Sequence, residues 1–146
     1  MIPQTPMQKW LDQHMSIFDE LSNAVTLVAK TAGDAGRTID RHGEHGEQAK
    51  QSLVQTSGAA MELLAVVGRA RGLPSIPDEE TQLHFDAALG RWADAAKAIA
   101  LAAQSGDAAE SVRGARALEA GNNEILRAAA ALRRATDQAP DPRTVR

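Results

Sequence analysis

Hydrophobic residues near the start of the chain recur at alternating steps of four and three. The first run comprises Met7, Leu11, His14, Phe18, Leu21, Val25, Val28 and Ala32. This spacing places one apolar stripe along a helix that packs against other helices. Thr5, Pro6 and Gln8 supply a helix start, with a hydroxyl cap, a proline in the first turn and a capping-box partner. Gly33 favours a stop, so the pattern predicts a helix over 6–32.

The stretch that follows is charged and interrupted by Gly33, Gly36, Gly43 and Gly46. Each glycine costs about 1 kcal/mol inside a helix. The apolar spacing nevertheless continues through Ala35, Ile39, His42, Gly46, Ala49 and Leu53. Two arrangements fit: a loop near residues 33–37 followed by a helix over 38–71, or one very long helix. We expect the loop, because a continuous helix would reach about 100 Å with no element of matching length to cover it.

Two further helices are predicted over 78–104 and 108–137. Their apolar stripes are Phe85, Leu89, Trp92, Ala96, Ile99 and Ala103 in the first, and Ala115, Leu118, Asn122, Ile125, Ala129 and Leu132 in the second. The short turn between them makes these helices antiparallel neighbours, and their alanines predict a close approach of the axes.

No alternating strand pattern occurs in the sequence. We therefore predict an all-α protein, an up-down-up-down antiparallel four-helix bundle, with one domain over 1–138 and a flexible tail over 139–146.

Composition excludes several kinds of protein. The 146 residues include no cysteine, which excludes disulfides, thiolate metal sites and a cysteine nucleophile. A net charge of -3 and only 3% aromatic residues argue against nucleic acid as a partner.

We see neither a signal peptide nor an apolar stretch long enough to span a membrane, and we expect a cytoplasmic protein. The abundance of alanine and the preference for arginine over lysine suggest a bacterial source.

Histidines and carboxylates gather in the densest polar cluster, which comprises Asp40, His42, Glu44, His45 and Glu47. His42 and His45 are three residues apart, a spacing at which two histidines of a helix can share a metal ion. However, Gly43 and Gly46 interrupt that helix. The Glu-x-x-His pairs of di-iron bundles and the His-Glu-x-x-His order of zinc proteases are also absent. We expect a solvated charged segment that holds no metal.

Four further positions are candidates for polar or contact roles. We expect His14, in the first apolar stripe, to be a packing residue. Asn122, in the last stripe, sets register or partner number, or contacts a ligand inside the bundle. Trp10 and Trp92 are core residues or, if exposed, contact hot spots. We expect solvated surface rather than a basic strip from the arginines of the last helix, which are Arg113, Arg116, Arg127, Arg133 and Arg134.

No catalytic motif or phosphate-binding loop is present, so we expect no catalytic residue and no cofactor. The main hypothesis is a non-enzymatic helical-bundle protein that mediates protein–protein interaction or self-association. Its alanine-rich core contributes little hydrophobic free energy, which favours a second chain that completes it. Because the bulky side chains lie in the first two predicted helices, we expect any pocket or partner surface there.

Two alternatives rest on resemblance. The four-helix outline resembles the sensor domains of bacterial chemoreceptors, which implies a small-molecule-binding bundle. The cysteine-free amphipathic composition with few aromatic residues resembles the granule-coating phasins, which implies a protein that covers a surface.

Overall fold

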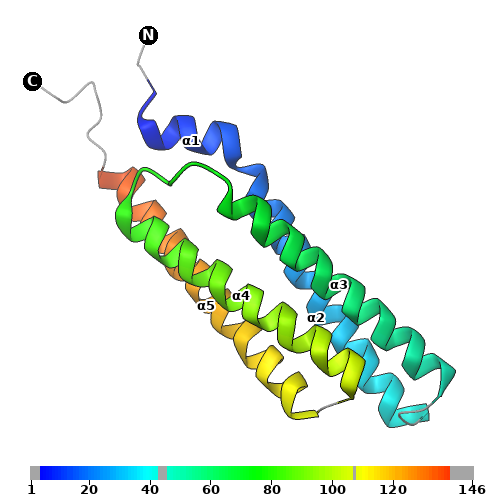
Figure 1. The fold of residues 1–146 in the computed structure, drawn as a ribbon. Coiled ribbons are helices and arrows are strands. Elements are labelled where there is room, and N and C mark those ends of the chain that lie inside the picture. Colours follow the sequence, from blue (N-terminus) through cyan, green and yellow to red (C-terminus); the bar gives the residue numbers. More distant parts are fainter. Residues whose placement is uncertain (1–3, 43–45, 107, 139–146) are drawn as a thin grey trace, which may run out of the picture.

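The computed structural model describes residues 4–42, 46–106 and 108–138. These residues form five α-helices and no strand (Figure 1). The helices are α1 (Pro6–His14), α2 (Ser16–His42), α3 (Glu47–Arg71), α4 (Glu79–Ser105) and α5 (Ala108–Gln138). The predicted all-α class is confirmed.

The predicted count of four helices is wrong, because the helix expected over 6–32 is interrupted at Met15. Its start is as predicted: Thr5 and Gln8 form the capping box. At the interruption, the N–H of Phe18 donates to the carbonyl oxygen of Met15 at 3.1 Å, a tighter turn than that of an α-helix. Trp10 on α1 donates its indole N–H to the carbonyl oxygen of Pro74 at 2.8 Å, which attaches α1 to the connection between α3 and α4.

The loop expected near 33–37 is also wrong, because α2 continues through both glycines there and ends at His42. Three contacts support this part of the helix. Ala35 is 4% exposed, Thr38 Oγ1 donates to the carbonyl oxygen of Asp34 at 2.8 Å, and Arg37 pairs with Asp34 one turn away. Together these contacts offset the cost of the two glycines. The single long helix is not formed either, since α3 packs alongside α2 (Figure 1).

The four long helices lie side by side, and the chain turns back at each connection (Figure 1). Helix α4 packs against both α3 and α5, and α2 packs against α3. In the described part of the chain, α2 and α5 form no comparable interface. Because α5 packs mainly against α4, its predicted apolar stripe is only partly enclosed. Leu118 is buried, whereas Ala115, Asn122 and Ala129 are exposed. No helix of the described residues is long and apolar enough to cross a bilayer.

Helices α4 and α5 approach closely, as their alanines predicted, and two glycines of α5 allow this. A Cβ atom on Gly114 would lie 2.5 Å from Cγ1 of Ile99, and one on Gly121 would lie 2.4 Å from Cδ1 of Trp92. The core of the molecule also contains Leu21, Leu63 and Phe85, each at most 2% exposed. The tail predicted over 139–146 lies outside the described residues.

Candidate interaction surface

Large hydrophobic side chains are exposed on the outward sides of α3 and α4. Val54 and Met61 on α3 are 71% and 57% exposed, and Leu83 and Leu101 on α4 are 66% and 54% exposed. Val54 and Met61 are two helical turns apart, and Leu83 and Leu101 are five turns apart. Each pair therefore lies on one side of its helix. We call these four residues the α3–α4 surface.

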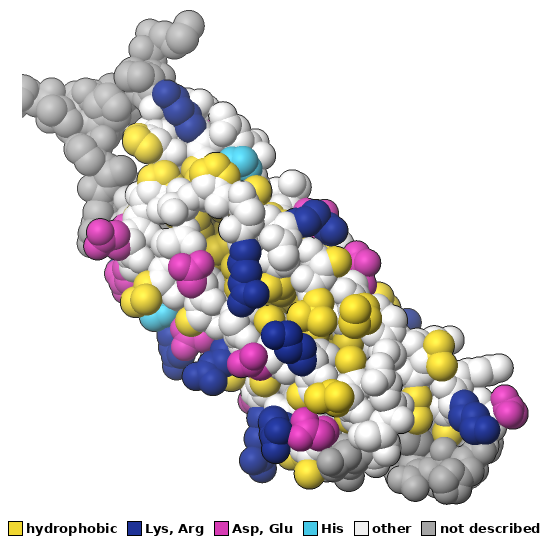
Figure 2. Space-filling view, viewed as in Figure 1, with side chains coloured by type: hydrophobic (Ala, Val, Ile, Leu, Met, Phe, Trp, Pro, Cys, Tyr) yellow, Lys and Arg dark blue, Asp and Glu magenta, His cyan; other side chains and the backbone are white. Residues whose placement is uncertain are grey.

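The two halves of this surface border the contact between α3 and α4. Leu64 on α3 and Ala100 on α4 pack against the hydrophobic core. Met61, three residues before Leu64, and Leu101, directly after Ala100, lie further round toward solvent. Figure 2 shows hydrophobic side chains gathered over α3 and α4 on the face turned to the viewer, with charged side chains around them. A contiguous exposed apolar patch is a feature typical of contact surfaces, so this face is the candidate interaction surface.

Other exposed hydrophobic residues lie on α5. Val112 and Leu126 are 50% and 67% exposed, and Glu119 lies midway between them on the same side of the helix. On α4 the position seven residues after Leu83 is Gly90, and the position seven residues before Leu101 is the exposed Asp94. A charged side chain thus lies within the strip of each helix, whereas Val54 and Met61 on α3 are seven residues apart with no such residue midway on that side.

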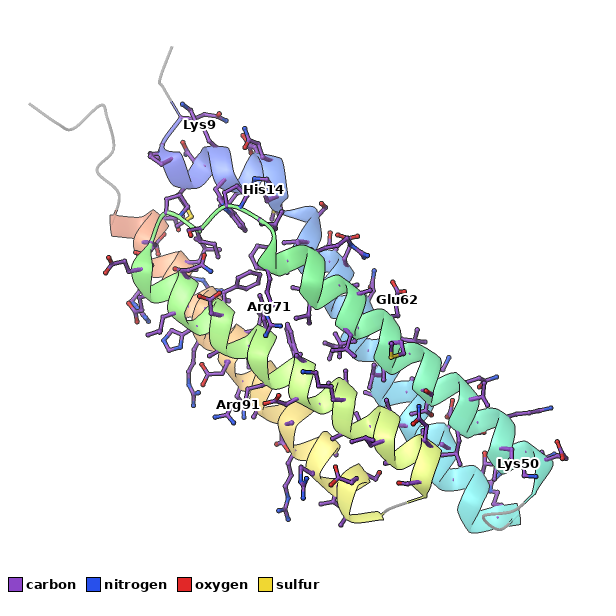
Figure 3. The ribbon with its side chains drawn as sticks, in the orientation of Figure 1. Lys9, His14, Lys50, Glu62, Arg71 and Arg91 are labelled. Carbon is purple, nitrogen blue, oxygen red and sulfur yellow. The ribbon has the colours of Figure 1, made fainter. Side chains whose placement is uncertain are left out.

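The structure brings two of the predicted site residues together at α1. The rings of Trp10 and His14 lie 5.2 Å apart, and Phe18 on α2 continues the cluster to Phe85 on α4 at 5.4 Å. Trp10 is 5% exposed and His14 is half-buried. Figure 3 shows His14 at the α1 end of the molecule. These contacts attach α1 to the other helices.

Trp92 and Asn122 also meet, across the contact between α4 and α5. The indole N–H of Trp92 donates to Oδ1 of Asn122 at 3.1 Å, and Trp92 is 3% exposed. Because an indole N–H needs a partner when it is buried, Asn122 allows Trp92 to pack in the core. The two tryptophans are therefore enclosed residues rather than exposed contact residues.

Sequence reasoning missed the pair formed by His84 on α4 and Glu124 on α5. Nδ1 of His84 lies 3.1 Å from Oε2 of Glu124, and this hydrogen bond is the main cause that holds the pKa of Glu124 below its usual value. Desolvation opposes the shift and Arg127 adds to it. Nothing in the spacing within either helix connects residues 84 and 124, since their contact depends on how α4 and α5 are aligned.

The arginines of α5 make no continuous basic strip. Arg113 pairs with Glu110, Arg127 pairs with Glu124, and Arg134 reaches Glu80 on α4 at 2.6 Å. These pairs offset much of the positive charge along the helix. All three arginines are more than half exposed, where ion pairs contribute little to stability.

The polar cluster of histidines and carboxylates, for which we expected no metal ion, is only partly described. His42 is the last residue of α2 and its side chain is not described, and His45 lies outside the described residues. Among the described residues, no group of three or more histidines and carboxylates is arranged to hold a metal ion.

Comparison with protein-family models, curated proteins and solved structures gives no match. The functional argument therefore starts from the surface and the contacts described above.

Proposed function

We propose that this chain is a non-enzymatic helical protein that mediates protein–protein interaction, and that its α3–α4 surface associates with a second copy of the chain. The observation that supports the proposal is the exposure of Val54, Met61, Leu83 and Leu101, each more than half accessible to solvent. Burial of one such side chain contributes about 1.5–3 kcal/mol. Association itself costs about 4–15 kcal/mol, so a symmetric contact that buries all four from both copies is favourable but modest.

The charges next to this surface suit a two-fold arrangement. Arg71 at the end of α3 and Asp86 near the start of α4 are both exposed, and Arg71 lies next to the connection between these helices (Figure 3). A two-fold axis parallel to the helices places α3 of one copy over α4 of the other. Arg71 then faces Asp86 of the partner copy, and in the same register Met61 faces the part of α4 between Asp94 and Lys97.

The test is the molar mass in solution, measured by light scattering after size exclusion over a wide range of concentration. The wild-type chain is expected to show a concentration-dependent dimer, and Met61→Glu is expected to be monomeric because its charge would be buried in the contact. Val112→Glu is the matched control: it adds the same charge at a half-exposed apolar residue of α5 and should dimerise like the wild type. A wild-type chain that stays monomeric throughout, or a Met61→Glu variant that still dimerises, would contradict the proposal.

A further inference from the structure

A polar pocket lies between the end of α2 and the start of α3, away from the α3–α4 surface. Its volume is about 400 Å³, which is within the range of small-molecule sites. The lining residues are Asp34, Arg37, Thr38 and Arg41 from α2, and Gln48, Gln51, Ser52 and Gln55 from α3. On both helices these positions follow steps of three, one and three, so each helix presents a single polar stripe to the pocket.

The base of the pocket is formed by hydroxyl groups. Thr38 and Ser52 are half-buried, and Oγ of Ser52 donates to Oγ1 of Thr38 at 3.4 Å. Thr38 in turn donates to the carbonyl oxygen of Asp34. No apolar side chain lines the pocket, whereas most small-molecule sites are mainly apolar. A hydrophobic ligand would therefore gain little here.

The charge of the pocket is positive. Arg37 pairs with Asp34 within α2. Arg41, one turn further along the same helix, forms no ion pair with any carboxylate in the part of the chain that the structure describes. Two guanidinium groups and one carboxylate leave a surplus of one positive charge among the lining residues. The three glutamine amides add both donors and acceptors.

We infer that this pocket binds a small hydrophilic anion, a molecule that carries a phosphate or carboxylate group on a polar body. Arg41 binds the oxyanion, because guanidinium forms paired hydrogen bonds with both groups. Arg37, which is also paired with Asp34, contributes a second guanidinium group to the binding of the oxyanion. Gln51 and Gln55 hydrogen-bond the rest of the ligand. The inference does not depend on the proposed self-association, since the pocket lies between α2 and α3 and none of its lining residues belongs to the α3–α4 surface.

The experiment is a titration of the full-length chain, followed by amide NMR, at constant ionic strength. The probes are pyrophosphate and citrate, and sodium chloride serves as the control for screening. One or both probes are expected to give saturable shifts confined to the end of α2 and the start of α3. Preference for pyrophosphate identifies a phosphate site, and preference for citrate identifies a carboxylate site.

Two variants complete the test. Arg41→Gln is expected to weaken binding about tenfold or more, because it removes a charge-assisted hydrogen bond. Arg91→Gln, which removes an exposed arginine of α4 (Figure 3), should bind like the wild type. The inference is overturned if neither probe gives saturable shifts or if the shifts are not confined to these two helix ends. It is also overturned if Arg41→Gln binds the probe as tightly as Arg91→Gln does.

Discussion

Gly121 on α5 lies directly against the indole ring of Trp92 on α4. A Cβ atom there would stand 2.4 Å from Cδ1 and 2.5 Å from Nε1 of the ring. The indole cannot move freely, because its N–H is bonded to Asn122 and the side chain is 3% exposed. The absence of a side chain at Gly121, as at Gly114, therefore allows the two helices to approach this closely.

We predict that Gly121→Ala destabilises the protein by about 1–3 kcal/mol through overpacking, although alanine is the better helix former by about 1 kcal/mol. The matched control is Gly58→Ala in α3, where a Cβ atom meets nothing within 4 Å. There only the helix preference acts, and stability should rise by about 0.5–1 kcal/mol. Urea unfolding measures both changes. Equal effects of the two substitutions would show that Trp92 can give way.

Trp92 and Asn122 were identified from the sequence as separate candidates, and their hydrogen bond was not predicted. The apolar spacing assigns each residue to a side of its own helix, but it carries no information on the alignment of α4 with α5. His84 and Glu124 were missed for the same reason.

At the scale of elements, the start of α1, the end of α3 and both ends of α4 and α5 lie within one residue of their predicted bounds, whereas α2 ends at His42 rather than at 32 and α3 begins at Glu47 rather than at 38. The capping box at Thr5 acts locally, through bonds within the first turn. The end of α2 was misplaced because the cost of Gly33 and Gly36 is small compared with what the packing of α2 on α3 contributes. Near them, Thr56 on α3 donates to the carbonyl oxygen of Thr31 at 3.1 Å, a contact between two helices that no local pattern reveals.

The start of α4 provides a prediction at this scale. Asp78 caps the helix: the side chain and the backbone N–H of Thr81 donate to its Oδ2 at 2.6 and 3.0 Å, and these bonds lower its pKa from the ordinary value of 3.8. A carboxyl group with a lowered pKa in the folded state stabilises the fold above its unfolded pKa. This stabilisation is lost as the pH falls through the folded value.

We therefore expect Asp78→Ala to lower the free energy of unfolding by about 1 kcal/mol at neutral pH, and the loss to shrink on acidification below about pH 4. Urea unfolding across this range measures the difference. Asp94→Ala, an exposed substitution in the middle of α4, is the control and should not destabilise the protein. A loss that is the same at neutral and acid pH would show that the charge of Asp78 does not contribute.

At the scale of the whole molecule, α4 is the central helix, since it packs against α3, α5 and, to a small extent, α2. The expected four-helix packing placed every apolar stripe inside. In the structure one side between α2 and α5 lacks a comparable contact, and the outer faces of α3 and α4 carry exposed apolar residues. The polar pocket was likewise not anticipated, because its residues were assigned to a predicted loop near 33–37 and to the first part of the helix predicted over 38–71.

The two-fold arrangement proposed above makes a prediction about charge at this scale. Arg71→Glu should weaken the dimer by placing like charges opposite each other, and adding Asp86→Arg should restore it by exchanging the pair. Sedimentation equilibrium of the single and double variants measures this. If the double variant is no better than Arg71→Glu alone, the copies associate in another geometry.

The enclosed positions of Trp10 and Trp92 have an optical consequence. The chain contains these two tryptophans and no tyrosine, so nearly all its intrinsic fluorescence comes from two points, one between α1 and the α3–α4 connection and the other between α4 and α5. Emission excited in the near ultraviolet thus monitors the docking of α1 and the pairing of the last two helices without an added label. Replacement of Trp10 by phenylalanine would leave a single emitter that follows the second contact alone.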